Sequence, residues 1–195
     1  MSSRPQRQRF GASQKERIFF ACLPDAETAA RIYALGERLK RANGFDGTQV
    51  LPNHLHVTLY HLGDWPTLPA PVVSAAEEAA AQIDVPSFEI AFTRSESFRG
   101  GMGPYPFVLT CEQDEAAWLA LRHPLGAAME RVGLGGATRG QFTPHMTLLR
   151  DEKRARSAPI EPIKWTVREF VLVHSLLGKT THIHLGRWPL GIGTA

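Results

Sequence analysis

The 195-residue sequence predicts an α+β protein with two related lobes, each carrying an antiparallel sheet and flanking helices, around a central cleft. A repeat is the first reason. His-x-Thr-Leu occurs as His56-Val57-Thr58-Leu59 and as His145-Met146-Thr147-Leu148, both in apolar, strand-like runs, whereas composition alone would produce one match on the order of 0.05 times. The order of elements is the second reason. It reads β-α-β-α-β and then β-α-β-β-β, with a helix ahead of each tetrad, which fits a duplicated half better than a doubly wound parallel sheet.

The first half opens with residues 1–15, which are basic, polar and low in apolar side chains, so we expect a disordered tail. Residues 17–23 are rich in aromatic and branched side chains and predict a strand. Asp25 fits the cap of a helix that ends at Asn43-Gly44. The apolar stripe of that helix consists of Ala29, Ile32, Leu35 and Leu39. A strand over about 54–60 carries the first tetrad, an alanine-rich helix follows over 69–84, and residues 86–92 predict a further strand.

The second half begins in the same order, with a strand over 107–111 and a helix over 114–132. The glycine-rich segment 99–104 precedes the strand and predicts a turn or mobile loop. Four glycines between 133 and 140 lead into the strand of the second tetrad. Two final strands are expected over 165–176 and 181–188. We expect residues 16–195 to form a single bilobal domain.

Composition gives weaker information about function. The chain is 43% hydrophobic and 21% charged, which is ordinary for a globular protein, and its net charge of +3 favours an anionic partner. Basic residues gather in the N-terminal segment, which is either simply solvated or attracts phosphates. Cys22 and Cys111 do not predict a disulfide framework. No apolar run reaches the length of a membrane span, and no secretory core follows the basic start, so the cytoplasm is the expected location.

The repeated tetrads carry the chemistry. Residues two apart on a strand share a face, so His56 lies beside Thr58 and His145 beside Thr147. Two such strands would bring two imidazoles and two hydroxyls to one cleft. One imidazole can take a proton while the other gives one, and the threonines can hold anionic oxygens. This set of groups suits in-line attack on a phosphate diester, although the residues alone do not say which histidine is the acid.

Neighbouring residues extend the candidate site. Arg150 ends the second motif, and its guanidinium could bind two phosphate oxygens. Strict alternation would put Arg150 on the face opposite His145, so it must lie past a bend or reach round the strand end. Tyr60 is expected on the face of His56 and Thr58, where it either stacks on a base or packs in the protein.

Other readings of the histidines remain open. His54-x-His56 and His182-x-His184 each place two imidazoles on one strand face, which is a spacing that zinc sites use. No His-Glu-x-x-His, cysteine pair or obvious neighbouring carboxylate accompanies them. Serine hydrolase chemistry lacks its Gly-x-Ser-x-Gly turn. His123 and His174 are interpreted as structural residues.

Taken together, the motifs resemble those of the two-histidine phosphoesterases, and among them the bacterial RNA 2′,3′-cyclic phosphodiesterases, also called LigT-like or 2′-5′ RNA ligase proteins. The resemblance covers about residues 16–190. It rests on the tetrads, on Leu62-Gly63 after the first, and on the Phe142-x-Pro144 lead and Arg150 around the second. The segments 17–21, 173–175 and 188–190 also resemble the family's pattern. One departure is His61, where the family usually has phenylalanine.

The resemblance implies a bilobal α+β fold and an enzyme without cofactor or metal. It implies hydrolysis of a 2′,3′-cyclic phosphate at an RNA end to a 2′-phosphate, with the joining of RNA ends by a 2′-5′ bond as a second activity. In that scheme His56 is the proton donor and His145 the proton acceptor, while Thr58, Thr147 and Arg150 bind the phosphate. Tyr60 and His61 are the candidates for contact with a base.

The sequence therefore predicts a metal-independent RNA 2′,3′-cyclic phosphodiesterase, a hydrolase whose partners are RNA with cyclic phosphate ends or related nucleotides. One alternative is a two-histidine phosphoesterase for another substrate, such as a small cyclic nucleotide or a 2′-5′ oligonucleotide. A non-catalytic RNA-binding module is the alternative from a different class. It has no need of paired proton-transfer groups.

Overall fold

The computed structural model describes residues 15–99, 103–111 and 113–191. The predicted tail over residues 1–15 therefore lies outside the described residues except for Lys15, and so does the centre of the predicted loop over 99–104. The strands are β1 Glu16–Cys22, β2 Val57–Trp65, β3 Phe88–Ser97, β4 Tyr105–Thr110, β5 His145–Asp151, β6 Ala158–Val167, β7 Glu169–Leu176 and β8 Thr181–Pro189. The helices are α1 Ala26–Asn43, α2 Ala70–Ala80 and α3 Glu115–Arg131, with short 3-10 turns at Pro52–His54 and Gly135–Ala137.

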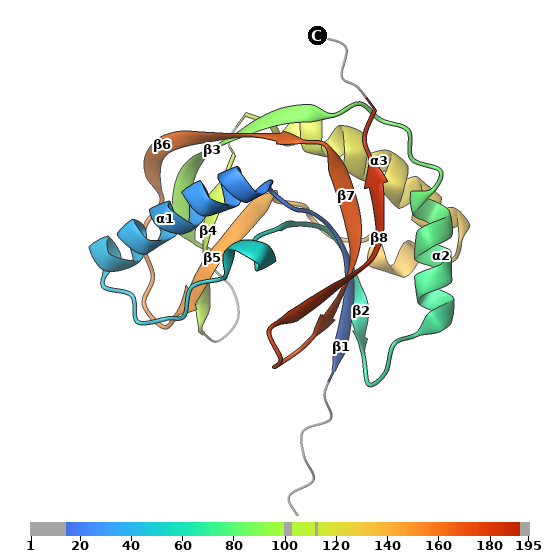
Figure 1. The fold of residues 1–195 in the computed structure, drawn as a ribbon, viewed down its shortest axis with the longest axis horizontal. Helices are drawn as coiled ribbons and strands as arrows, with labels where there is room; N and C mark the ends of the chain where they lie inside the picture. Colours follow the sequence, from blue (N-terminus) through green and yellow to red (C-terminus); the bar gives the residue numbers. More distant parts are fainter. Residues whose placement is uncertain (1–14, 100–102, 112, 192–195) are drawn as a thin grey trace, which may run out of the picture.

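The α+β class is confirmed, but the predicted pair of sheets is not what the strands form. Across the described part of the chain, eight strands make one antiparallel sheet in the order β6-β3-β4-β5-β2-β1-β7-β8. The two motif strands, β2 and β5, are neighbours at its centre. The sheet is strongly curved, with α1 near β5 and β6 and the pair α2 and α3 at the other side of the molecule (Figure 1).

Local sequence signals place α1 as predicted. The Asp25 carboxylate accepts hydrogen bonds from the backbone N–H and the hydroxyl of Thr28, which satisfies a free donor of the first turn. At the other end Gly44 adopts a left-handed conformation with φ of 62°, and its N–H bonds back to the last turn. Ala29, Ile32 and Leu35 are buried. The helix therefore covers the sheet with the stripe that its sequence indicated.

The prediction of one strand over 165–176 is wrong. The chain breaks at Arg168 into β6 and β7, which lie in opposite halves of the sheet. Trp165 on β6 pairs with Ile90 on β3, whereas Val171 on β7 pairs with Ala21 on β1. Residues 165–167 alternate in hydrophobicity, residues 170–173 are continuously apolar, and no glycine or proline separates them, so the sequence shows one run. The pairing partners, which are remote in the chain, decide that it is two strands.

The sheet separates a large core from a small one. The large core lies between the sheet and the helices and contains the fully buried Trp118, Phe92, Phe107 and Phe170. The small core is made by Phe19, Ala21, Val171 and Val173 on the other face of β1 and β7. It provides an apolar support beneath one end of the central cleft. None of the described helices combines the length and the apolar character that crossing a membrane requires.

Candidate active site

The two motif strands meet at one cross-strand pair. Val57 of β2 and Met146 of β5 are antiparallel partners, and both side chains are fully buried. The residues on either side of them point to the opposite face of the sheet. Antiparallel register then places His56 across from Thr147, and Thr58 across from His145. The repeated tetrads therefore form one site with approximate two-fold symmetry, across a strand pair within one sheet.

Each tetrad contains a β-bulge at its leucine. Along β1, Ala21 pairs with Thr58 and Phe20 with Tyr60, so the register omits Leu59. Along β4, Val108 pairs with Thr147 and Phe107 with Leu149, so it omits Leu148. A bulge adds one residue and reverses the alternation beyond it. The residue three positions after each threonine thereby returns to the face of the tetrad.

This reversal explains two side chains that strict alternation misplaces. Arg150 follows the bulge in β5 and lines the same cavity as His145 and Thr147. The predicted bend is therefore the bulge at Leu148. His61 follows the bulge in β2 and lines that cavity as well.

Tyr60 does not share the face of His56 and Thr58, contrary to the prediction from alternation. Its side chain is buried in the large core, and its hydroxyl donates a hydrogen bond of 2.9 Å to the Arg122 carbonyl on α3. The Arg122 guanidinium lies 4.3 Å from the centre of the Tyr60 ring and 4.6 Å from the centre of the Phe142 ring. A side chain at Gly126 would collide with the Tyr60 hydroxyl. This packing fits one of the two earlier alternatives, and Tyr60 also lines a smaller cavity together with Thr58 and His61.

The cleft holds a cavity of about 460 Å³. The five residues proposed from sequence for acid–base work and phosphate binding all line it, namely His56, Thr58, His145, Thr147 and Arg150. So do residues from strands that are distant in sequence: Arg17, Phe19, Ser175 and His182. Its walls thus combine imidazoles, hydroxyls and guanidinium groups, which are donors suited to an anionic oxygen.

The two tetrad imidazoles are held in the same way. The Nδ1–H of His56 donates to the carbonyl of His54 at 2.7 Å, and the Nδ1–H of His145 donates to the carbonyl of Thr143 at 2.7 Å. A carbonyl can only accept, so the Nδ1 atoms carry the hydrogen in both rings. This leaves Nε2 of each neutral ring as the atom that can take or, once protonated, give a proton.

A phenylalanine ring packs against each of the two imidazoles. The Phe19 ring lies 4.9 Å from the ring of His56, and the Phe98 ring lies 4.8 Å from the ring of His145, measured between ring centres. Burial lowers the pKa of His56, and the nearby His145 and His54 imidazoles lower it further, against the His54 carbonyl, which raises it. Burial also lowers the pKa of His145, and the positive Arg150 contributes to the decrease. Both imidazoles are therefore biased toward the neutral form.

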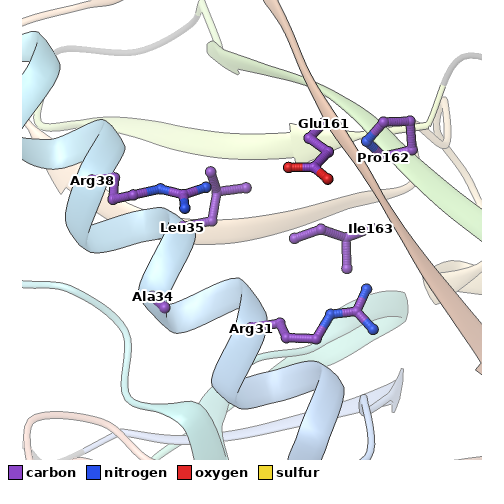
Figure 2. A pocket seen from close by; sticks show the side chains of 7 residues that line it. All are labelled: Arg31, Ala34, Leu35, Arg38, Glu161, Pro162 and Ile163. Carbon is purple, nitrogen blue, oxygen red and sulfur yellow. The ribbon is translucent and has the colours of Figure 1, made fainter.

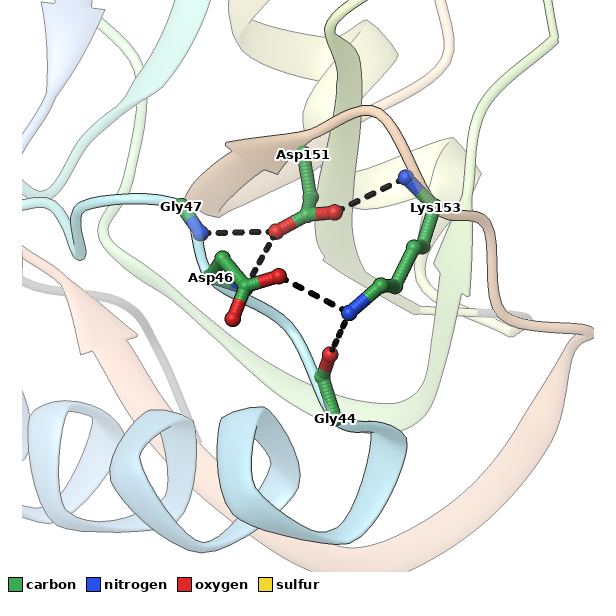
Figure 3. Close-up of polar contacts among 5 residues, drawn as sticks. All are labelled: Gly44, Asp46, Gly47, Asp151 and Lys153. Carbon is green, nitrogen blue, oxygen red and sulfur yellow. Dashed lines mark hydrogen bonds and ion pairs between the residues drawn. The ribbon is translucent and has the colours of Figure 1, made fainter.

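Asp151, the residue after Arg150, is bound by a loop from the other half of the chain that contains Asp46 and Gly47 (Figure 3). One Asp151 oxygen accepts hydrogen bonds from the N–H groups of Asp46 and Gly47, each at 2.6 Å, and the other accepts from the Lys153 N–H at 2.8 Å. A side chain at Gly47 would collide with the Arg150 carbonyl. The bonds to Lys153, Gly47 and Asp46 lower the pKa of Asp151. This carboxylate therefore positions Arg150 without facing the cleft itself.

His182 is a site residue that the prediction did not place in the cleft. It stands on β8, and its ring lies 4.5 Å from His54 and 5.6 Å from His56 between centres. Burial lowers its pKa to about 4. The His182-x-His184 spacing was visible in the sequence, but only as a metal alternative. Among the described residues, no group of three or more histidine, cysteine, aspartate or glutamate side chains is arranged to hold a metal ion.

A different cavity, of about 340 Å³, lies between α1 and β6. Figure 2 shows Arg31 and Arg38 on the helix and Glu161 on the strand around it. No imidazole, thiol or hydroxyl lines this cavity among the described residues. It therefore offers no proton-transfer pair of the kind that the central cleft contains.

Comparison with known proteins gives matches over most of the chain. The family model of the 2′-5′ RNA ligase superfamily matches residues 24–179. The RNA 2′,3′-cyclic phosphodiesterase of Escherichia coli strain K12 is 29% identical over 201 residues, which cover 91% of this chain and 98% of that protein.

Solved structures show the same fold. The crystal structure of E. coli LigT in apo form superimposes with a TM-score of 0.70 at 27% identity, covering 91% of this chain and 99% of that one. The structure of E. coli LigT complexed with 3′-AMP superimposes with a TM-score of 0.67 at 25% identity, covering 91% and 98%. The superposition covers nearly the whole length of both of these structures, so the similarity is not confined to the tetrads.

Proposed function

Because the chain belongs to the 2′-5′ RNA ligase superfamily, we propose that it is a metal-independent RNA 2′,3′-cyclic phosphodiesterase. The observation that carries the proposal is the matched pair of imidazoles. His56 and His145 come from adjacent strands, line one cavity and are held by equivalent Nδ1–H bonds. An E. coli relative that is 29% identical is named RNA 2′,3′-cyclic phosphodiesterase.

The reaction needs two proton transfers on opposite sides of one phosphorus atom. In the proposed scheme Nε2 of His145 takes a proton from water as the water oxygen attacks phosphorus. The bond between phosphorus and O3′ breaks, and protonated His56 gives its proton to O3′. The product carries a 2′-phosphate and a free 3′-hydroxyl. A 5′-hydroxyl of another RNA in place of water would give a 2′-5′ bond by the same two transfers.

The remaining site residues supply charge and orientation. Thr58 and Thr147 lie across from the two imidazoles by register, where their hydroxyls can donate to non-bridging oxygens. Arg150 adds a fixed positive charge, and its fork suits two phosphate oxygens. Such donors stabilise the negative charge that develops on the phosphate during attack. The proposed partners are RNA molecules with 2′,3′-cyclic phosphate ends, and the free, buried Cys22 and Cys111 support the cytoplasm as the proposed location.

One experiment tests the proposal directly. RNA ending in a 2′,3′-cyclic phosphate is incubated with the protein in EDTA, and the product ends are identified. We expect hydrolysis to a 2′-phosphate, because proton transfer and charge stabilisation come from side chains. A 3′-phosphate product would mean that the bond between phosphorus and O2′ breaks instead, which would contradict the proposed leaving oxygen. Loss of turnover in EDTA with recovery on adding zinc would favour the histidine pairs at 54–56 and 182–184 as a metal site.

The same assay separates the alternatives. Turnover of a small cyclic nucleotide without turnover of RNA ends would favour a related phosphoesterase. Binding of RNA without any turnover would favour a non-catalytic binding module.

A further inference from the structure

His61 occupies the position in β2 that Arg150 occupies in β5. Each residue stands three positions after the threonine of its tetrad, beyond a bulge at the leucine. Both side chains line the central cavity. In the proposed function Arg150 contacts the phosphate, but its counterpart His61 has no role there.

His61 is the outer member of a hydrogen-bonded triad. Its Nε2 lies 2.9 Å from Oδ1 of Asp64. Arg17 on β1 donates to both Asp64 oxygens, from Nε and from one terminal nitrogen, at 2.8 Å each. The side chains of His61, Asp64 and Arg17 are 50%, 25% and 41% exposed. Asp64 therefore orients the imidazole, and half of the His61 side chain stays exposed.

The charges of this triad depend on His61. Arg17 holds the pKa of the Asp64 carboxyl well below its usual range, so the carboxylate is ionised and Nε2 of His61 is the hydrogen donor. The charges of Arg17 and Asp64 cancel. Nδ1 of His61 remains free for a ligand, as an acceptor in the neutral ring and as a donor in the protonated one. Only protonation of His61 gives the triad a net charge of +1.

The charged groups that line the cavities around His61 favour an anion. A second cavity, which adjoins the central one, is also lined by His61, with Arg122 from α3 and Arg139 from the loop before β5. The other charged or titratable groups that line the two cavities are Arg17 on β1, His56 beside β2, His145 and Arg150 on β5, His182 on β8 and Tyr60. No carboxylate lines either cavity among the described residues, and Asp64 is the acid that contacts His61.

The reach of the side chain indicates which anion is bound. Three strand residues span about 10 Å, so His61 stands well beyond Thr58 and away from the scissile phosphate. Arg150 is equally remote along its strand, but its long side chain can reach back, whereas an imidazole is short. His61 and Arg150 also extend in opposite directions from the Val57–Met146 pair, because β2 and β5 are antiparallel. A group about one nucleotide away from the cyclic phosphate is therefore within reach of His61.

We propose that His61 is a specificity-determining residue, which in its protonated form binds the phosphodiester on the 5′ side of the terminal nucleotide. This inference rests on the proposed function, since it adds a second anion subsite to the same cleft. Base stacking, which phenylalanine would provide at this position, is the alternative that the experiment separates.

The test compares two probes that differ only at the 5′-oxygen. One is a nucleoside 2′,3′-cyclic phosphate with a free 5′-hydroxyl. The other carries a 5′-methyl phosphodiester with a single negative charge. We expect the ratio of kcat/KM, phosphodiester over hydroxyl, to be roughly 3–10 times higher for the wild type than for His61→Phe, as for an exposed charge-assisted hydrogen bond.

Three variants make the result specific. His61→Phe should lower the ratio by this factor, and the guanidinium groups that line the two cavities account for the preference that remains. His61→Arg, which copies Arg150, should keep the ratio at or above its wild-type value. His123→Phe alters an exposed histidine on α3 outside both cavities and should behave as the wild type. A ratio that His61→Phe preserves overturns the anion subsite, whereas turnover of the hydroxyl probe upholds the proposed function. Turnover of neither probe overturns both.

Discussion

Val57 of β2 and Met146 of β5 are antiparallel partners, and this pair sets the register between the two motif strands. Its consequence is that each tetrad histidine stands across from the threonine of the other tetrad. A phosphate placed between the strands then meets an imidazole and a hydroxyl from each side. The proton donor and acceptor of the proposed reaction thus come from equivalent positions, and their surroundings must make them different.

Substitution of either imidazole should have a large effect on rate. His56→Ala and His145→Ala should each lower kcat by roughly 10²–10⁴-fold, the usual contribution of one general acid or base. The double variant should lose less than the product of the two effects, because the pair acts as a unit. Single-turnover rates measure this, with circular dichroism as the control for folding. A single variant with nearly wild-type turnover would remove that histidine from the mechanism.

A substrate with a good leaving group should separate the acid from the base. Such a group needs no proton to depart, so His56→Ala should be substantially rescued on an activated cyclic phosphodiester. His145→Ala should not be rescued, because water still needs a base. The comparison is the ratio of rates on the activated and natural substrates for each variant. Rescue of His145→Ala instead would exchange the two roles.

The value of kcat/KM should be highest at acidic pH. The pKa values of His56 and His145 are both lowered, chiefly by burial. The acid must be protonated and the base neutral, so kcat/KM rises as one group loses its proton and falls as the other does. Because both values lie below the usual value of about 6.5, we expect the optimum of kcat/KM below about pH 6.5. The profile of kcat should shift to higher pH, since a bound phosphate anion favours imidazolium. An optimum of kcat/KM above about pH 7.5 would contradict this assignment.

Asp151→Asn should impair both stability and catalysis. An amide cannot accept hydrogen bonds at both positions, so the Asp46–Gly47 loop and the Arg150 backbone should move. Folding lowers the pKa of Asp151, so its contribution to stability is full above its unfolded value of about 3.9 and disappears as the pH falls through the lower folded value. The melting temperature of the variant should therefore differ from that of the wild type at pH 7 and converge with it in strong acid.

A matched control for Asp151 lies in the same loop. Asp46→Asn removes an exposed carboxylate that contacts Lys153 but keeps the backbone bonds to Asp151. It should leave the melting temperature and kcat/KM nearly unchanged. Equal effects of the two substitutions would mean that the ion pair with Lys153, rather than the Asp151 bonds, holds the loop.

The sequence by itself determined the features that depend on near neighbours. The spacing of histidine and threonine put both on one strand face, and the tetrads therefore predicted a paired acid–base site. Asp25 and Gly44 marked the ends of α1, because capping depends on residues within one helical turn. The α+β class followed from patterns of the same short range.

Only the tertiary structure decided what depends on remote partners. The bulges at Leu59 and Leu148 appear when β2 pairs with β1 and β5 with β4. They turn His61 and Arg150 toward the cleft and move Tyr60 into the core. His182 reaches His56 from a strand more than a hundred residues away, and the break at Arg168 separates β6 from β7. Hydrophobic alternation reports which residues are buried, but strand register is set by hydrogen bonds between segments that no local pattern connects.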